Sequence, residues 1–358
     1  MTRKNIRELL PDMILNGRTV TDPETGVLYC DWSCSGFTVG VKGSSLRIRV
    51  NPEADAIQQS AGEPPLPLLW PEIGVAAREG LLFREECRES RWITVYEGKE
   101  YASREITVTK LNENARGKLG VMELETDGGF FRPQQPIKKR IEVVGDSITC
   151  GFGNEPPAMN GLIRENGRNT YGFIAASLLD ADVSLVGVSG ICGVRQQGKG
   201  EPAMEDLYPY ADALLAVKHG SAPEEWDFGK RRNDAVVINL GTNDTVRIGS
   251  AFDEEEKEEL RSTFFRRYTE FVRTVRRLNG PQCLILCCAG PMDYSLAPEI
   301  RRAAEAVDSE MRSGRVLYFE FAPIDPVAEG YGSEFHPSGV THRRMGIELA
   351  GQLRKNLQ

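Results

Sequence analysis

From residue 141 onward, short apolar runs alternate with segments of helical spacing, and this alternation restricts the possible fold more than any other feature. The apolar runs, rich in β-branched residues, indicate strands at 141–145, 182–188, 234–240, 282–288 and 315–321. Helical patterns separate them at 170–180, 202–219, 254–279 and 297–312, and a last helix is expected over about 338–356. Strands that are apolar along nearly their whole length fit a parallel sheet covered on both faces. The sequence therefore predicts an α/β domain with three α/β/α layers.

The first 130 residues have a different pattern, in which apolar and polar residues alternate. Runs at 36–41 and 46–50 flank Lys42-Gly-Ser-Ser45, which indicates a hairpin turn. The same alternation recurs at 91–96, 105–109 and 119–125, with a turn expected at Glu97-Gly98. Because no amphipathic helices intervene, we expect an antiparallel β-sandwich.

These two patterns divide the chain. We expect a β-sandwich domain over residues 1–130, a linker over 131–140 and the α/β domain over 141–358. Within the first domain, residues 52–73 contain Pro64-Pro-Leu-Pro67 and are expected to form a long loop. Two domains also suit a chain of 358 residues, since single cores rarely exceed about 250–300 residues.

Charge and composition exclude several classes of partner. The formal net charge is -8, so the chain lacks the basic footprint of a nucleic-acid-binding protein. We find no signal peptide and no apolar run long enough to cross a membrane, so we expect no membrane partner. A cytoplasmic location follows as the expectation, or secretion if a leader has been removed. Cys30 and Cys34 lack a second ligand pair, so we expect no metal site.

Polar and glycine residues follow four of the predicted strand positions. Ser147, Gly190 and Asn243 come shortly after the first, second and third runs, and His336 lies in a loop beyond the fifth. Because the carboxyl ends of parallel strands meet at one edge of a sheet, a single crevice can collect these residues.

Such a set supplies the parts of an acyl-transfer site. A serine hydroxyl is a weak nucleophile until a base takes its proton, and histidine suits that role because its pKa lies near neutrality. We prefer His336 as the base, because His219 falls at a helix end and His342 inside the last predicted helix. Taken alone, Ser147 could equally be a turn hydroxyl.

A developing oxyanion needs donors that are already in place. The backbone N–H groups of Ser147 and Gly190 and the side-chain amide of Asn243 would serve. Each also has a plainer interpretation as a turn residue. Asp146 and Asp244 could hydrogen-bond within the site, and we interpret both as scaffolding.

In combination, these residues resemble a known family. The blocks Gly145-Asp-Ser-Ile-Thr149, Gly190, Gly241-Thr-Asn-Asp244 and His336-Pro337 occur in the order typical of SGNH (GDSL-type) hydrolases and span residues 141–358. The resemblance implies that Ser147 is the nucleophile, that Gly190 and Asn243 complete the oxyanion hole, and that His336 is the base.

The longer string from Gly145 to Glu155, preceded by a β-sandwich, resembles carbohydrate esterase family 2, the acetyl xylan esterase-like enzymes. Members pair a jelly-roll-like domain with an SGNH domain and remove acetyl groups from sugars. The resemblance implies a serine esterase that forms an acyl-enzyme on acetylated oligo- or polysaccharides, with no metal or organic cofactor. It does not indicate the sugar, the hydroxyl position or the oligomeric state.

One position departs from the family pattern. SGNH enzymes commonly carry Asp three residues before the histidine, and here that residue is Ser333. His336 is then oriented by Ser333, by Glu334 or by a backbone carbonyl, or it works with Ser147 as a dyad. The orienting group chiefly fixes the tautomer, so its loss lowers the rate without changing the reaction.

Two rival functions stay open at this point. A lipase- or thioesterase-like SGNH hydrolase would act on acyl chains and would have a long apolar groove. A carbohydrate-binding protein with a catalytically weak hydrolase domain is the rival from another class. Sugar binding usually involves an aromatic platform, for which Phe335, Tyr331 and Trp226 are the candidates.

Overall fold

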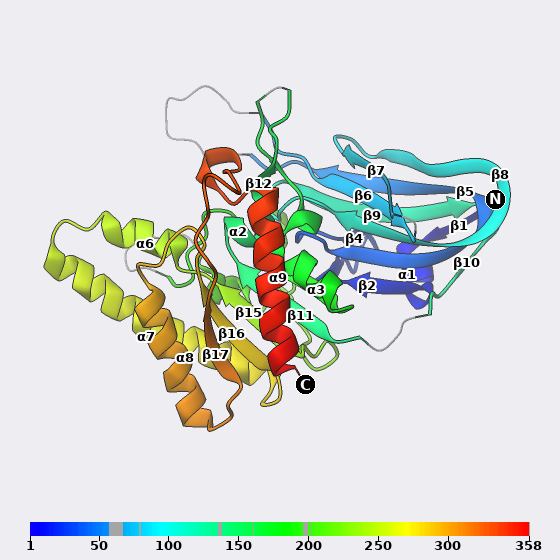
Figure 1. The fold of residues 1–358 in the computed structure, drawn as a ribbon. Coiled ribbons are helices and arrows are strands. Elements are labelled where there is room, and N and C mark those ends of the chain that lie inside the picture. Colours follow the sequence, from blue (N-terminus) through cyan, green and yellow to red (C-terminus); the bar gives the residue numbers. More distant parts are fainter. Residues whose placement is uncertain are drawn as a thin grey trace. The chain divides into compact units, whose positions relative to one another are not determined.

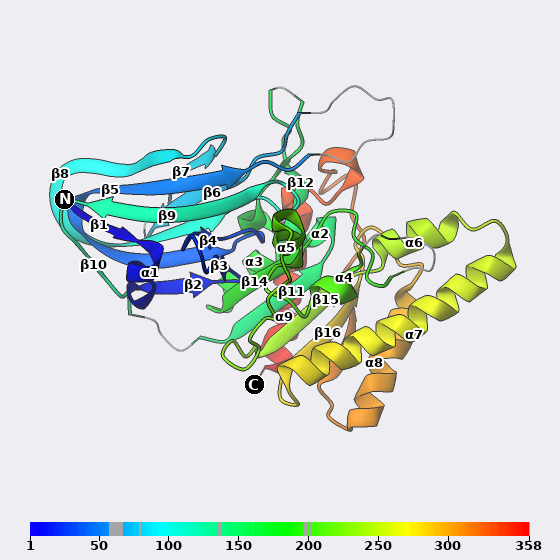
Figure 2. The same cartoon turned by 180° about the vertical axis from the view of Figure 1, so that it is seen from behind.

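The computed structural model of the chain describes residues 1–56, 67–78, 80–134, 138–159, 161–195, 200 and 202–357. They form two compact units, drawn in Figures 1 and 2. Unit 1 comprises Met1–Ile137 and Ala211–Glu224, and unit 2 comprises Lys138–Tyr210 and Glu225–Gln358. Residues 57–66 of the loop expected over 52–73, and residues 135–137 of the expected linker, lie outside the described part.

Unit 1 is built on one antiparallel sheet, in which the strand order is β3-β4-β9-β5-β8-β6-β7, with β1 beside β9 and with β2 and β10 beside β5. The antiparallel architecture that the alternating pattern predicts is confirmed. The strands are β1 (Thr2–Asn5), β2 (Met13–Asn16), β3 (Val20–Thr21), β4 (Leu28–Tyr29), β5 (Gly36–Glu53), β6 (Glu72–Ala77), β7 (Gly80–Glu86), β8 (Arg91–Lys110), β9 (Lys118–Thr126) and β10 (Gly129–Phe131). A short helix, α1 (Ile6–Leu9), follows β1.

The predicted turns at Lys42–Ser45 and Glu97-Gly98 are wrong. Both segments lie inside long strands, because β5 and β8 pair with each other on either side of them. The register shifts between Gly43 and Ser45, whose partners are Ala102 and Glu97. Such a bulge lets both strands bend and continue, so glycine and serine mark a bend here and not a chain reversal.

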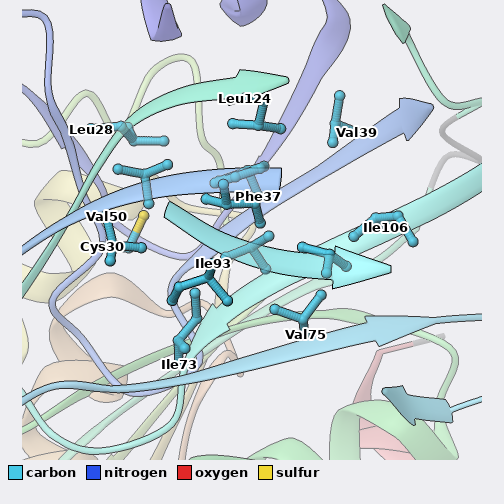
Figure 3. Close-up of a cluster of buried hydrophobic side chains, with 14 of the residues drawn as sticks. Leu28, Cys30, Phe37, Val39, Val50, Ile73, Val75, Ile93, Ile106 and Leu124 are labelled. Atoms are coloured by element: carbon cyan, nitrogen blue, oxygen red, sulfur yellow. The ribbon is translucent and has the colours of Figure 1, made fainter. Parts of the chain in front are cut away.

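The core of unit 1 comes from the inward-facing positions of these strands. Phe37, Val39 and Val50 on β5 are fully buried, and they lie in one cluster with Ile93 and Ile106 of β8 (Figure 3). The spacing of two between Phe37 and Val39 is what the alternating sequence pattern dictates for a sheet with one face in the core.

A segment far along the chain also belongs to unit 1. Helix α5 (Ala213–His219) lies in it, and Asp212 caps the helix by accepting a hydrogen bond from the Leu215 N–H. The Trp32 indole donates to the Ala211 carbonyl over 2.8 Å, and the Asn114 amide donates to Asp212 over 2.7 Å. The single helix expected over 202–219 is therefore wrong, since α4 (Met204–Leu207) and α5 belong to different units.

Unit 2 contains the parallel sheet, with the strand order β14-β11-β15-β16-β17. All neighbouring pairs are parallel, which confirms the α/β prediction. The strands are β11 (Arg140–Gly145), β14 (Asp182–Gly187), β15 (Ala235–Asn239), β16 (Leu284–Ala289) and β17 (Val316–Glu320). A small hairpin of β12 (Phe152–Glu155) and β13 (Arg164–Glu165) stands apart from this sheet.

Helices lie on both faces of the parallel sheet. Figure 1 shows α9 in front of the strands, and Figure 2, from behind, shows α7 in front of them. The helices of unit 2 are α2 (Ser147–Cys150), α3 (Tyr171–Leu178), α4, α6 (Thr242–Gly249), α7 (Glu254–Asn279), α8 (Ala297–Met311) and α9 (Gly339–Asn356). In the described residues, no helix combines the length and the apolar character that crossing a membrane requires.

Candidate active site

Ser147 lies at the point where β11, an interior strand of the parallel sheet, passes into helix α2. The strand is buried along most of its length, and Asp146 caps the helix because its Oδ1 accepts the Ile148 N–H over 3.0 Å. Gly151, at φ +86°, ends the helix after one turn in a left-handed conformation that suits glycine. The Ser147 side chain is thus held at the carboxyl edge of the sheet.

His336 makes direct contact with Ser147. Its Nε2 lies 2.9 Å from the Ser147 Oγ, and its Nδ1 lies 3.1 Å from the backbone carbonyl oxygen of Glu334. A carbonyl only accepts, so the proton sits on Nδ1, and Nε2 is left with a lone pair toward the serine hydroxyl. This is the tautomer in which histidine can take the proton from Ser147.

The backbone before His336 is unusual. Glu334 has φ +50° and Phe335 has φ +60°, so two successive residues other than glycine are left-handed. This conformation costs about 1–3 kcal/mol at each such residue and occurs mainly at functional sites. Here it turns the Glu334 carbonyl toward the imidazole. Of the orienting groups left open by the sequence, a backbone carbonyl is the one placed at Nδ1.

Contacts within the loop and with segments distant in the sequence hold the loop in place. The Gly332 N–H donates to the His336 carbonyl over 2.8 Å, which closes the loop on itself. A side-chain Cβ at Gly332 would lie 2.3 Å from the Gly153 carbonyl oxygen, so this close approach requires glycine. Glu329 accepts hydrogen bonds from Arg344 and Thr341 on α9 and so fixes the start of the loop.

The expected oxyanion donors also lie near one another. Asn243 stands at the start of α6, and its Nδ2 donates to the Ile191 carbonyl over 3.0 Å and toward Asp146 Oδ2 over 3.4 Å. Ile191 directly follows Gly190, which is exposed with φ +77°. Within the described part of the chain, no acceptor faces the backbone N–H groups of Ser147 and Gly190. Two N–H groups are therefore available to a substrate oxygen.

Two buried carboxyl groups lie behind these donors. Burial raises the pKa of Asp146 to about 7, and the nearby Asp244 charge adds to the shift. Burial also raises the pKa of Asp244 to about 6, although hydrogen bonds from the Gly193 and Val194 N–H groups act in the opposite direction. The sequence allowed hydrogen bonds of both residues within the site, and the structure places them against the loop of Gly190 and the amide of Asn243.

The remaining histidines and aromatic candidates lie elsewhere or at the rim. His342 is fully buried in α9, and burial lowers its pKa to about 3, so it stays neutral. Phe335 is 77% exposed and forms an edge-to-face pair with Tyr331, with ring centroids 5.7 Å apart. Trp226 lies on the segment that leads to the amino end of β15. Its backbone N–H donates to the Pro209 carbonyl.

Comparisons with known proteins agree with this architecture. A model of the GDSL-like lipase/acylhydrolase family matches residues 143–344. The cellulase/esterase CelE of Acetivibrio thermocellus is 28% identical over 355 residues, which cover 97% of this chain and 40% of that protein. An acetylxylan esterase/glucomannan deacetylase of Cellvibrio japonicus is 30% identical over 259 residues, which cover 70% of this chain and 66% of that protein. The chain thus spans between two-fifths and two-thirds of the length of these two relatives.

A solved structure resembles the chain over most of its length. A family two carbohydrate esterase from Clostridium thermocellum in complex with cellohexaose has a TM-score of 0.77 and 26% identity, over 96% of this chain and 99% of that one. The resemblance to SGNH hydrolases and to the second carbohydrate esterase family, first seen in the sequence blocks, is thereby confirmed.

Proposed function

Because the chain belongs to the GDSL-like lipase/acylhydrolase family, we propose that it is a serine esterase that removes acetyl groups from carbohydrates. The observation that carries the proposal is the 2.9 Å contact between His336 Nε2 and Ser147 Oγ, with Nδ1 held by the Glu334 carbonyl. A nucleophile, a base and an orienting group are the minimum that acyl transfer requires.

The reaction uses these groups in sequence. Ser147 Oγ attacks the acetyl carbonyl carbon while its proton passes to His336 Nε2. The tetrahedral oxyanion lies against the N–H groups of Ser147, Gly190 and Asn243. On collapse, His336 returns the proton to the departing sugar oxygen, and the acetyl group remains on Ser147. His336 then takes a proton from water, whose oxygen attacks the acetyl-enzyme. On collapse His336 passes that proton to Ser147 Oγ, so acetic acid leaves and the free serine and the neutral base are restored.

The carbohydrate part of the proposal rests on two supports. The exposed pair of Phe335 and Tyr331 stands beside the base, and an exposed aromatic face is suited to stacking on a sugar ring. The relatives' names point the same way, since one is an acetylxylan esterase/glucomannan deacetylase and the Clostridium thermocellum esterase was solved with cellohexaose. The proposed substrate is therefore an acetylated oligo- or polysaccharide of the xylan or glucomannan type.

A test compares wild type, Ser147→Ala and the control Ser177→Ala on an aryl acetate. Ser177 lies on α3, and its hydroxyl donates to the Phe173 carbonyl, away from the site. We expect Ser147→Ala to lose nearly all activity and Ser177→Ala to keep it. Equal rates for wild type and Ser147→Ala would refute the proposed esterase activity.

The acyl and sugar preferences need separate measurements. Aryl esters of increasing chain length should show a maximum at acetate, whereas a maximum at long chains would favour a lipase-like activity. Acetate release from acetylated xylan and glucomannan then tests the sugar, and Phe335→Ala should raise KM for these substrates while leaving aryl acetate hydrolysis nearly unchanged.

A further inference from the structure

Two buried carboxylates stand directly behind the proposed oxyanion donors. Asp146 is 1% exposed and Asp244 is 0% exposed. Burying a charge is costly unless it is paired or hydrogen-bonded. Within the described residues, neither carboxylate has an ion-pair partner, and both use their two oxygens on N–H donors. Their position therefore calls for an explanation beyond packing.

Asp146 connects the nucleophile to Asn243. One oxygen accepts the Ile148 N–H over 3.0 Å and so sets the turn that carries Ser147. The other oxygen faces the Asn243 Nδ2 over 3.4 Å, while the Ile191 carbonyl accepts from the same nitrogen over 3.0 Å. The amide is thus aimed by two acceptors, one at the end of β11 and one in the loop after β14.

Asp244 fixes that loop from the other side. Its Oδ2 accepts the Gly193 N–H over 2.8 Å, and its Oδ1 faces the Val194 N–H over 3.4 Å. Gly193 lies three residues after Gly190 and two after Ile191. The same carboxylate therefore holds both the donor loop and the carbonyl that aims Asn243.

We propose that Asp146 and Asp244 are positioning residues of the oxyanion hole, Asp146 by aiming the Asn243 amide and Asp244 by fixing the loop that carries Gly190. The inference rests on the proposed esterase function and adds two residues that act through others on the transition state. Neither residue contacts the reacting atoms.

The chemistry of the two contacts shows why a carboxylate is needed. Each aspartate presents two acceptor oxygens to two N–H groups. Asparagine has the same shape but only one acceptor, so in either flip of its amide an NH2 group faces an N–H. Asp146→Asn and Asp244→Asn therefore keep the volume and break one contact each.

The longer contact of Asn243 indicates how the hole works. Both N–H groups of the amide already face acceptors, so a forming oxyanion must share one of them. The 3.4 Å contact with Asp146 is the weaker, and the N–H in it is the one that an oxyanion can draw away. Asp146 thus keeps the donor aimed before the oxyanion exists.

The experiment measures kcat and KM on an aryl acetate for wild type, Asp146→Asn and Asp244→Asn, with Glu142→Gln as the control. Glu142 is also buried, but it lies near the amino end of β11, four residues before Asp146. Removing one oxyanion donor lowers kcat by about 10²–10³-fold, so we expect loss of its positioning to lower kcat about 10–100-fold with KM changed less than about twofold. Glu142→Gln should keep kcat within about twofold of wild type, whatever its melting temperature.

A second measurement separates positioning from general destabilisation. Methylboronic acid adds to a serine hydroxyl as a tetrahedral anion, and its affinity for each variant should fall by about the same factor as kcat. If Asp146→Asn does not fold, Asp146→Ser replaces it, since a serine hydroxyl keeps the helix cap but is too short to reach Asn243.

The outcomes are distinct. An inactive wild type refutes the esterase itself. If the wild type is active, two results refute this inference and leave the esterase standing. In the first, both asparagine variants keep kcat within about twofold of wild type. In the second, kcat falls while the affinity for methylboronic acid is unchanged. A parallel fall of kcat and boronic acid affinity, absent in Glu142→Gln, supports it.

Discussion

The segment of Ser147, the proposed nucleophile, and the loop of His336, the proposed base, meet at one hydrogen bond, yet they are held by different means. Residues 141–151 form a buried strand, a capped turn of helix and a glycine stop, so each feature follows from its own residues. The loop from Glu329 to Ser338 has no such local pattern. Its left-handed residues other than glycine are Glu334 and Phe335, and its anchors are Gly153 and Arg344.

This difference shows how His336 can be oriented without an aspartate three residues before it. A carboxylate would orient His336 through one side chain. Here the path of the backbone does so, because it brings a carbonyl to within 3.1 Å of Nδ1. A carbonyl fixes the tautomer as a carboxylate does, but it brings no full negative charge to stabilise the imidazolium.

The largest expected effect tests whether the two segments act as one unit. Ser147→Ala and His336→Ala should each lower kcat/KM on an aryl acetate by about 10⁴-fold or more, and the double variant should be no worse than either single one, because neither residue works alone. Steady-state kinetics on the three variants checks this. If the double variant loses activity by the product of the two single factors, the residues act independently and the dyad is wrong.

The next effect concerns Asn243, the one proposed oxyanion donor that is a side chain. Asn243→Ala should lower kcat by about 10²–10³-fold, because one oxyanion donor is removed. Val246→Ala on the exposed face of the same helix is the matched control and should leave kcat unchanged. A loss confined to KM would mean that Asn243 binds the ground state and does not serve the oxyanion.

The same contrast explains what the sequence could predict. The five parallel strands were predictable because each is apolar along nearly its whole length, and Ser147 because it directly follows one of them. The turn at Lys42–Ser45 was predicted wrongly, since glycine and serine mark a β-bulge as readily as a hairpin. The split of 202–219 could not be foreseen, because Trp32 and Asn114 hold Ala211 and Asp212 from nearly 100 residues away or more.

The choice among the groups that could orient His336 was beyond sequence reasoning for a related reason. A left-handed backbone is predicted from glycine, and neither Glu334 nor Phe335 is one. The glycines Gly153 and Gly332 indicate that the backbone is closely approached at each of these positions, but they do not indicate by which segment. Their being neighbours in space is a property of the folded chain, and no spacing in the sequence reveals it.

A smaller effect concerns the pH dependence of stability on the nucleophile side. The folded pKa of Asp146 is about 7, above its unfolded value of 3.8, because of burial. A raised carboxyl pKa means that the folded state holds the proton more tightly, so folding is favoured as the pH falls from 7 toward 4. Between pH 7 and pH 5 the wild type should gain about 2–3 kcal/mol relative to Asp146→Asn, whose side chain does not titrate.

Wild type must be compared with Asp146→Asn because His342 changes the pH dependence of stability in the opposite direction. Its folded pKa is about 3, below the ordinary value of 6.5, so its contribution to stability is lost as the pH falls from 6.5 toward 3. Urea unfolding of both proteins at several pH values cancels this shared term. Parallel curves for wild type and Asp146→Asn would show that Asp146 does not titrate in this range.

The smallest expected effect is the sharpest test of the histidine loop. Glu334→Gln should change kcat and the pH profile of kcat/KM by less than about twofold, because the exposed side chain is altered while the backbone carbonyl at Nδ1 remains. If the carboxylate of Glu334 oriented His336, the loss should approach the roughly 10⁴-fold seen when a triad aspartate becomes asparagine. Ser333→Ala is the companion variant, and it too should stay near wild type. A large loss of activity in either variant would mean that a side chain orients His336. The proposed contrast, in which regular structure fixes Ser147 and the path of the backbone fixes His336, would then be wrong.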